Sequence, residues 1–468
     1  MADADIYLHV AAGQWIIENS SLPLADPFSF VMQGKPWVTH EWLSQLLMAL
    51  AYEMLGWFGV LLIAAVAFGL AMALQFRFLW YRVEPIHAVA LVCLSYAALL
   101  THFQARPHVL VWPLMAWWIG CIVGAAQRGQ SPSPWLLFCM LLWTNMHGSF
   151  VLGFVFLAFV LLDVVLRDFK QSGLWIRFFG FSLLVSLVNP YGWNALLFPF
   201  DLQSMELLRE ISEWASPQLI NLLPVLALGL VINSYAALGR MRIAPAYLPL
   251  IFALLYQAVS HVRYVSIAVF LIPFFVRAGP RSVLTGRSHG QAQSFSISLA
   301  SVGSSRQPLP ANLCSQRMVF SLVFTISLAV VSGFGYWKSY RPSELITPTN
   351  AVDVVMAKGV SGNVLNAYGY GGYLIFRKVP VFIDGRFDLY RDGHMSRYKD
   401  IEQDDPERIR AVLRDFDIQW TIFPKQHNIN RFLAQDPEWV LEHQDHGVMV
   451  FVRKKSDNLS PPELVQKQ

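Results

Sequence analysis

The sequence predicts a mainly α, polytopic transmembrane helix bundle followed by a small C-terminal α/β domain. Of its 468 residues, 55% are hydrophobic and only 14% are charged, whereas soluble domains carry about 25% charged residues. Apolar stretches near the ~20 residues that cross a bilayer recur as far as residue 337, and shorter β-branched runs around one charged helix follow after residue 341. The composition therefore excludes a soluble globular enzyme.

The apolar stretches predict about ten membrane spans, near residues 57–76, 86–104, 109–126, 134–147, 149–166, 174–188, 217–238, 244–260, 264–278 and 318–337. Arginine and lysine concentrate in every second loop between them, which the positive-inside rule assigns to the cytoplasm. The other loops and the C-terminal domain are expected outside. Residues 41–55 are too short and too polar to span, and their apolar stripe predicts a helix in the membrane interface.

Five segments follow from these spans. They are a first outer loop with its interfacial helix (1–56), a transmembrane core (57–278), a flexible cytoplasmic linker rich in Ser, Gly and Gln (279–317), a last transmembrane helix (318–340) and an extracytoplasmic α/β domain (341–468). With ten spans the N-terminus also lies outside, yet no signal peptide opens the chain. We therefore expect the natural gene product to begin upstream with one further helix.

In the C-terminal segment, strands are predicted for the runs GNVLNAY, GGYLIFR, PVFID, WTIFP and VMVFVR, and a helix for DDPERIRAVLRDF. Where PVFID ends, Asp384 and Arg386 flank Gly385, which suits a tight turn with positive φ. Two interpretations stay open for Arg386. It forms a local surface salt bridge with Asp384 that fixes the turn, or it binds substrate as part of a lid with neighbouring tyrosines.

Ionisable residues at a membrane edge are costly, so each one is a candidate for a functional site. On the predicted topology these residues gather on the outer side, namely Asp3, Asp5, His9, His40, Glu41, Arg106, His108, His147 and Arg263. Structural alternatives exist for each motif. DADIY can be a solvated terminus, HEW a helix cap, ARPH and NPYG turns, His147 a packing residue and Arg263 a snorkelling side chain.

Acidic residues with histidines and arginines at a membrane-edge cavity suit a lipid-phosphate substrate, because arginine pairs with phosphate as a charge-assisted fork. A carboxylate can then act as general base on an acceptor hydroxyl. The Asp-x-Asp pair of Asp3 and Asp5 could hold a divalent cation, although no third ligand is identified. No basic block with interleaved aromatics predicts nucleic-acid binding, and the four cysteines have no metal-site spacing.

The motifs DADIYLHVAAGQWIIENSSLPLADPFSF, GKPWVTHEWLSQ, ARPH, WTNMHGSFVLG, VNPYG, YGYGGYLIF and VFIDGRFDLY resemble uncharacterised bacterial polytopic membrane proteins related to the GT-C glycosyltransferases. Those relatives include the oligosaccharyltransferase catalytic subunit, protein mannosyltransferases and aminoarabinose transferases. The resemblance implies a GT-C-like bundle in the bacterial cytoplasmic (inner) membrane and a polyprenyl-phosphate-linked sugar donor. It also implies Asp5 or Asp3 as the catalytic acidic residue, and Arg106, His147 and Arg263 as donor-phosphate ligands.

Two classes of function therefore stand. The first is a GT-C glycosyltransferase that moves a sugar from a polyprenyl-phosphate donor to an extracytoplasmic acceptor. The second is a non-catalytic membrane protein, a transporter or a component of polysaccharide assembly. A transporter usually shows internal repeats and broken helices at the midplane. This sequence shows no repeat, and its polar residues lie at one edge, which favours the enzyme.

Overall fold

The computed structural model describes residues 3–101, 103–203, 205, 215–282, 342–403 and 405–454, with a few helical positions between 321 and 333. The predicted linker 279–317 and the predicted last span 318–340 therefore lie almost wholly outside the described residues. The chain divides into two compact units. The helical unit contains Ala12–Leu22 and Val38–Arg341, and the mixed unit contains Ala2–Ala11, Pro23–Trp37 and Pro342–Gln468.

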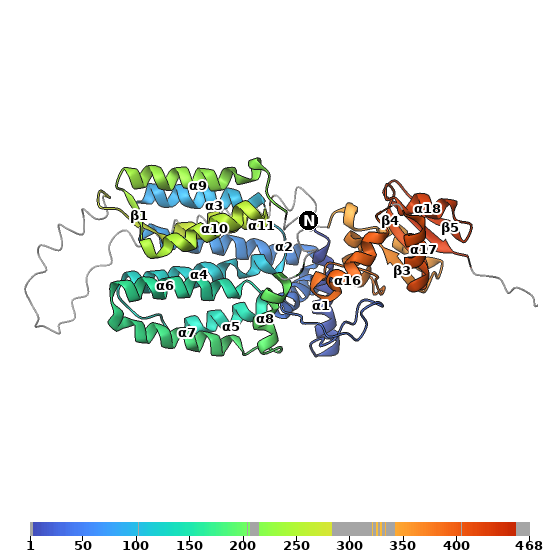
Figure 1. Ribbon diagram of the computed structural model, residues 1–468, viewed down its shortest axis with the longest axis horizontal. Helices are drawn as coiled ribbons and strands as arrows, with labels where there is room; N and C mark the ends of the chain where they lie inside the picture. The colour runs from blue at the N-terminus through green and yellow to red at the C-terminus, as the bar shows by residue number, and fades with distance from the viewer. Residues whose placement is uncertain are drawn as a thin grey trace, which may run out of the picture. The chain divides into compact units, whose positions relative to one another are not determined.

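The helical unit is a bundle in which α2 packs against α3 and α4, α4 against α5 and α6, and α11 against α3, α9 and α10 (Figure 1). A short antiparallel pair, β1 (Met241–Ile243) and β2 (Val276–Ala278), joins the chain on either side of α10 and α11. The helices are α2 (Trp42–Trp80), α3 (Pro85–Thr101), α4 (Pro107–Gln127), α5 (Leu136–Met146), α6 (Phe150–Arg167), α7 (Ser172–Ser186), α8 (Trp193–Gln203), α9 (Leu219–Ala237), α10 (Leu248–Ser260) and α11 (Arg263–Leu271).

Helix α2 is interrupted at Gly56, whose φ of 62° and ψ of −151° are not helical. The interruption falls where the sequence predicts the change from an interfacial helix to a span. Glycine is suited to it because a positive φ carries no steric penalty without a Cβ. Residues on the two sides of Gly56 can therefore follow different directions.

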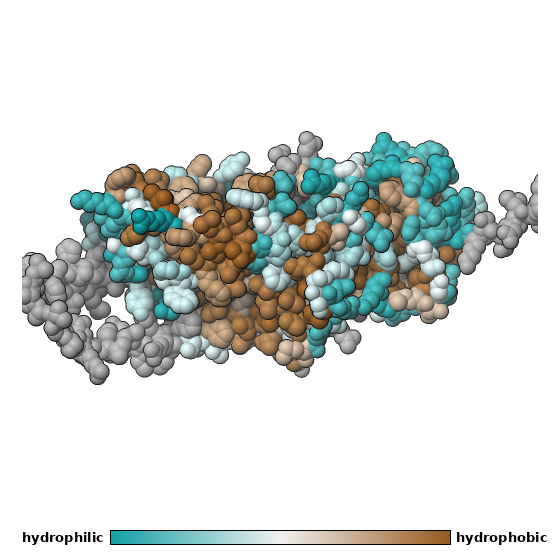
Figure 2. Space-filling model, turned by 90° about the horizontal axis from the view of Figure 1, so that it is seen from below, coloured by the Kyte–Doolittle hydropathy of each residue, from teal (hydrophilic) through white to brown (hydrophobic). Residues whose placement is uncertain are grey.

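Among the described helices, four are long and apolar enough to cross a membrane, namely α2, α4, α6 and α9. The predicted spans at 86–104, 134–147, 244–260 and 264–278 correspond to shorter apolar helices at Pro85–Thr101, Leu136–Met146, Pro245–Ser260 and Arg263–Phe275. Large apolar side chains such as Leu230, Phe252 and Leu166 are about 70% exposed. Figure 2 shows a broad hydrophobic face over the helical unit, as expected of a membrane protein.

The mixed unit contains a four-stranded sheet in the order β3-β4-β6-β5, in which β3 and β4 are parallel and the other pairs antiparallel. The strands are β3 (Asn363–Asn366), β4 (Ile418–Pro424), β5 (Trp439–Gln444) and β6 (Val448–Arg453). The helices of this unit are α14 (Thr349–Ala357), α15 (Gly371–Phe376), α16 (Phe387–Asp400), α17 (Pro406–Asp415) and α18 (Ile429–Gln435), together with the start of α1 (Asp5–Asn19). The predicted α/β character is confirmed.

Two predicted strands of this unit are wrong. GGYLIFR forms the short helix α15, in which residues 371–375 are buried. A continuous apolar run does not distinguish a buried helix from a buried strand. PVFID forms only an isolated bridge, between Val381 and Ser29. The next backbone amide bonds to a side chain and not to a neighbouring strand, because Phe382 N donates to Asn366 Oδ1 at 3.0 Å.

Candidate functional site

In the mixed unit a buried charge network links the first loop to the DGR motif. Arg386 Nη1 donates to Asp26 Oδ1 at 2.5 Å, while Nη2 and Nε donate to the two oxygens of Asp384 at 2.7 and 2.8 Å. The Tyr390 hydroxyl donates to Asp384 Oδ2 at 2.6 Å. The guanidinium also lies over the Trp37 ring, 4.6 Å from its centroid. All three nitrogens of the Arg386 guanidinium therefore donate to a carboxylate, and the group also contacts an aromatic ring.

This network is buried, so the interpretation of Arg386 and Asp384 as a surface salt bridge is wrong. The side chains of Asp26 and Asp384 are 0% exposed and that of Arg386 is 4% exposed. Burial alone would lower the pKa of Arg386, but Asp384, with Tyr390 and Asp26, raises it well above its ordinary value. Burial and Asp384 likewise raise the pKa of Tyr390. Arg386 is thus held as a permanent cation by two carboxylates.

The acidic motif of the first loop lies in the same unit. Asp3 is buried, and its Oδ1 accepts a hydrogen bond from Asp5 N at 3.1 Å. Asp5 begins α1, and its carboxylate lies directly against Gly385. His9, one helical turn further, is also buried. Gly385 is not among the glycines with positive φ, so the predicted left-handed turn is wrong, and the glycine instead allows this close approach.

In the helical unit Glu41 lies between two histidines. Its Oε1 is 3.3 Å from His147 Nε2 and 3.6 Å from His40 Nε2. Glu41 occupies the N-cap position of α2 without a side-chain capping bond, so the capping interpretation of HEW is wrong for its carboxylate. His40 stacks on Phe198, with ring centroids 3.9 Å apart. The carboxylate is therefore directed at imidazole nitrogens.

The orientation of His147 is set by its neighbours. Ser149 N donates to His147 Nδ1 at 3.0 Å, and Trp143 Nε1 donates to Ser149 Oγ at 3.0 Å. Because Nδ1 accepts from a backbone N–H, the neutral ring carries its proton on Nε2. That proton faces Glu41. The sequence marks His147, but the supporting roles of Trp143 and Ser149 have no signal in it.

Basic side chains also lie near Glu41, His40 and His147. His108 lies in electrostatic range of His147, Arg106, Arg263 and Glu41, and its ring centroid is 6.3 Å from that of His147. Arg106 is the N-cap residue of α4, and Arg263 opens α11. Six of the predicted site residues are therefore gathered in the helical unit, whereas Asp3, Asp5, His9 and Arg386 belong to the mixed unit.

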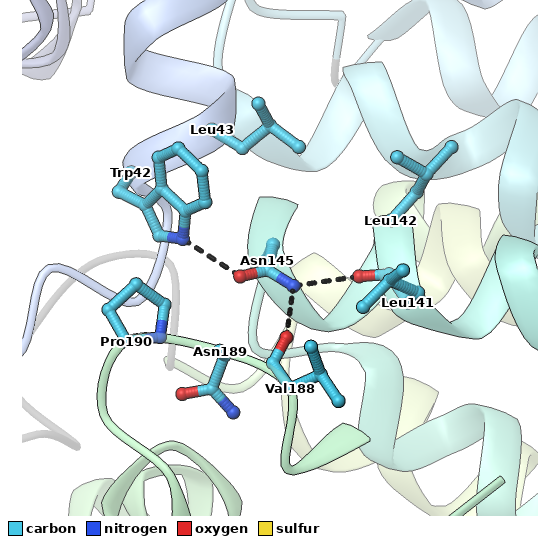
Figure 3. Close-up of a pocket in the computed structure, with 8 residues that line it drawn as sticks. All are labelled: Trp42, Leu43, Leu141, Leu142, Asn145, Val188, Asn189 and Pro190. Atoms are coloured by element: carbon cyan, nitrogen blue, oxygen red, sulfur yellow. Dashed lines mark hydrogen bonds between the residues drawn. The ribbon is translucent and has the colours of Figure 1, made fainter. Parts of the chain in front are cut away.

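A mainly apolar pocket of about 470 Å³ is lined in part by Trp42, the residue that follows Glu41 in the sequence (Figure 3). Asn145 anchors one side, because its Nδ2 donates to Leu141 O and Val188 O at 2.9 and 3.0 Å, and its Oδ1 accepts from Trp42 Nε1 at 2.9 Å. The NPYG segment is a turn closed by Asn189, as predicted, since Tyr191 N donates to Asn189 Oδ1 at 2.8 Å. The lining residues are Trp42, Leu43, Leu141, Leu142, Asn145, Val188, Asn189 and Pro190.

The residues that the structure describes include no group of three or more His, Cys, Asp or Glu side chains arranged to hold a metal ion. The sequence gives no sign that Asp26 pairs with Arg386, because 360 positions separate them. Its only local signal is the turn it caps, in which Asp26 Oδ1 accepts from Phe28 N at 3.0 Å and Oδ2 from Ser29 N at 3.1 Å.

Comparison with models of protein families and with curated protein sequences finds no match. Solved structures do match. ArnT from Cupriavidus metallidurans, bound to undecaprenyl phosphate, superposes with a TM-score of 0.55 at 12% identity, over 97% of this chain and 94% of that one.

The apo oligosaccharyltransferase of Archaeoglobus fulgidus superposes with a TM-score of 0.56 at 11% identity. The oligosaccharyltransferase AglB of the same organism, in complex with an inhibitory peptide and a dolichol-phosphate, gives 0.50 at 10% identity. Both matches cover 91% of this chain, which spans 66% of the length of either oligosaccharyltransferase. At these identities the likeness concerns the fold, and the chain has the fold of the GT-C glycosyltransferases.

Proposed function

We propose that the protein is an integral membrane glycosyltransferase of GT-C type that transfers a sugar from a polyprenyl-phosphate-linked donor to an acceptor outside the cytoplasm. One observation carries the proposal. The fold match to ArnT extends over 97% of this chain and 94% of a protein that is bound to undecaprenyl phosphate. Almost no part of the chain is left over for a different architecture.

The helical unit supplies groups that suit the donor phosphate. Arg106 and Arg263 both act electrostatically on His108, so their positive charges reach one region of the helical unit. A phosphate monoester or diester gains charge-assisted hydrogen bonds there. The leaving phosphate gains more than the intact donor, because negative charge grows on it as the sugar departs. The Nε2 proton of His147 faces Glu41, so Arg106 and Arg263 are the proposed phosphate ligands.

The acidic residue of the proposed reaction is Asp5, at the first position of α1. In the proposed reaction the oxygen of the acceptor hydroxyl bonds to the anomeric carbon of the sugar, and the Asp5 carboxylate accepts the proton of that hydroxyl. The bond between that carbon and the phosphate oxygen breaks, and the phosphate keeps the electron pair. Asp3 orients the first turn of α1 through its bond to Asp5 N. Proton transfer to a positioned side chain typically contributes 10²–10⁴-fold.

The pocket lined by Leu141, Leu142 and Val188 suits part of the isoprenoid chain. Its lining is mainly apolar, and both of its asparagines are already hydrogen-bonded. Asn145 bonds to two backbone carbonyls and to Trp42, and Asn189 bonds to Ser186 O and Tyr191 N. An apolar chain therefore enters it without leaving a buried polar group unsatisfied. We further propose a location in the bacterial cytoplasmic membrane with the mixed unit outside, supported by the alternation of arginine between loops.

Reconstitution in liposomes with a polyprenyl-phosphate sugar labelled in the sugar tests this function. A transferase releases free polyprenyl phosphate in step with loss of the labelled donor. A transporter instead moves the intact donor between leaflets and releases none. Movement of intact donor without release, over several acceptor classes, would replace the proposal with the non-catalytic alternative.

A further inference from the structure

Three glycines of the motifs YGYGG and DGR lie where an added Cβ would overlap another segment of the mixed unit. A Cβ on Gly372 would overlap Ala4 O and lie 3.3 Å from Leu8 N, so α15 packs directly on the first turn of α1. A Cβ on Gly371 would overlap Ile383 O and come within 2.7 Å of Asp384 Cα. Both glycines therefore set backbone spacing around the residues that flank Asp5 and Gly385.

Gly385 differs from the other two because its neighbour is a side chain. The three atoms closest to a Cβ at this position all belong to the Asp5 carboxylate, with Cγ at 2.7 Å and Oδ1 closer still. Real Cβ atoms essentially never come within 3.0 Å of another heavy atom. Any side chain at position 385 therefore requires the Asp5 carboxylate to move.

The segment that carries Gly385 has little freedom to yield instead. Arg386 N and Nε both donate to Asp384 Oδ1, at 2.9 and 2.8 Å, so the residues on either side of Gly385 are clamped together. Arg386 is further fixed by Asp26. With the DGR turn held by a buried network, displacement falls on Asp5, which is only partly buried at the first position of α1.

We propose that Gly385 is a positioning residue: because it has no Cβ, the Asp5 carboxylate can lie against it in the place needed for proton transfer. We call this contact between Gly385 and the Asp5 carboxylate the seat. Gly371 and Gly372 set how closely the backbone segments around the seat approach each other. The role in transfer rests on the proposed function, whereas the seat itself does not. The proposed role accounts for the glycines of the YGYGG and DGR motifs, which belong neither to the phosphate-binding groups nor to the pocket.

A stability cycle tests the seat without any activity measurement. Gly385→Ala is expected to lower the thermal midpoint, because the added Cβ forces the Asp5 carboxylate out of its place. In a protein that already carries Asp5→Ala, the carboxylate is absent, so the same substitution should lower the midpoint by less than half as much. Equal losses in both backgrounds would overturn the proposal. If Gly385→Ala fails to fold, recovery of folding in the double variant supports the seat, and failure of both overturns it.

Transfer kinetics test the consequence. Gly385→Ala should lower kcat by about 100-fold with KM for the donor within about threefold, because a misplacement of about 1 Å costs this much. Gly393→Ala is the matched control, since Gly393 is exposed in the same unit and has no atom within 4 Å of an added Cβ. If wild type transfers sugar and Gly385→Ala retains full kcat, positioning is overturned. If wild type transfers none, the proposed function fails while the stability cycle still decides the seat.

Discussion

Replacement of Arg386 by alanine should be among the most destabilising single changes in the mixed unit. The substitution leaves the carboxylates of Asp26 and Asp384, both 0% exposed, without their cation. Removal of one partner from a buried pair costs about 3–5 kcal/mol, because a charge stays buried and uncompensated. Loss of the contact with the Trp37 ring at 4.6 Å adds about 0.5–2 kcal/mol.

The matched control is Arg453→Ala. Arg453 Nη2 lies 3.0 Å from Glu438 Oε2, but the two side chains are 32% and 64% exposed. An exposed ion pair contributes about 0–1 kcal/mol, so the control should scarcely change stability. A third variant, Arg386→Met with both aspartates changed to asparagine, should recover part of the loss, since no charge is then stranded.

Hydrogen exchange of amides in β4 and β6, followed by mass spectrometry in detergent, reports the opening free energy of this unit. Arg386→Ala should lower protection by about two powers of ten or more, since each tenfold corresponds to about 1.4 kcal/mol. Equal protection in Arg386→Ala and Arg453→Ala would refute the buried-network reasoning.

Three further outcomes are expected. Glu41→Gln should keep the fold but lower kcat/KM about 10-fold or more, since the imidazole of His147 loses its charged partner; unchanged kcat/KM would remove Glu41 from the site. Burial lowers the pKa of His394, so protonation favours the unfolded state and stability falls as pH drops below about 6.5; His394→Gln should flatten the dependence of the thermal midpoint on pH between 6.5 and 5, and an unchanged slope would contradict this. Leu142→Trp should fill the pocket and raise KM for the donor, whereas Leu230→Trp, on a 70% exposed side chain, should not; equal effects would exclude the pocket.

The sequence predicted the helical bundle and the gathering of Glu41, His147 and His108 because two simple rules apply to them. Apolar stretches mark helices in a membrane protein, and costly polar residues that recur on one side of the predicted topology are expected to meet. The structure brings these three together within one unit. Local composition and topology are therefore sufficient to predict such a cluster when each of its residues lies at the end of a predicted helix.

The mixed unit was harder to predict because its decisive contacts are non-local. The partnership of Arg386 with Asp26 joins residues 360 positions apart, and no periodicity reports it. The run GGYLIFR has the composition of a strand, and its helical form depends on packing that its sequence does not contain. Gly385 has an ordinary φ, so its identity is explained only by the carboxylate that lies against it.

Asp5 is proposed to take part in transfer of a sugar from a polyprenyl-phosphate donor. The most direct measurement compares release of polyprenyl phosphate by wild type, Asp5→Asn and Glu18→Gln, each purified in detergent with the same labelled donor and acceptor. Glu18 lies on the same helix α1 and is exposed, so its variant controls for the loss of a negative charge. We expect Asp5→Asn to lower the rate by at least about 100-fold with the thermal midpoint unchanged, and Glu18→Gln to match wild type. Full activity in folded Asp5→Asn would contradict a catalytic role for Asp5.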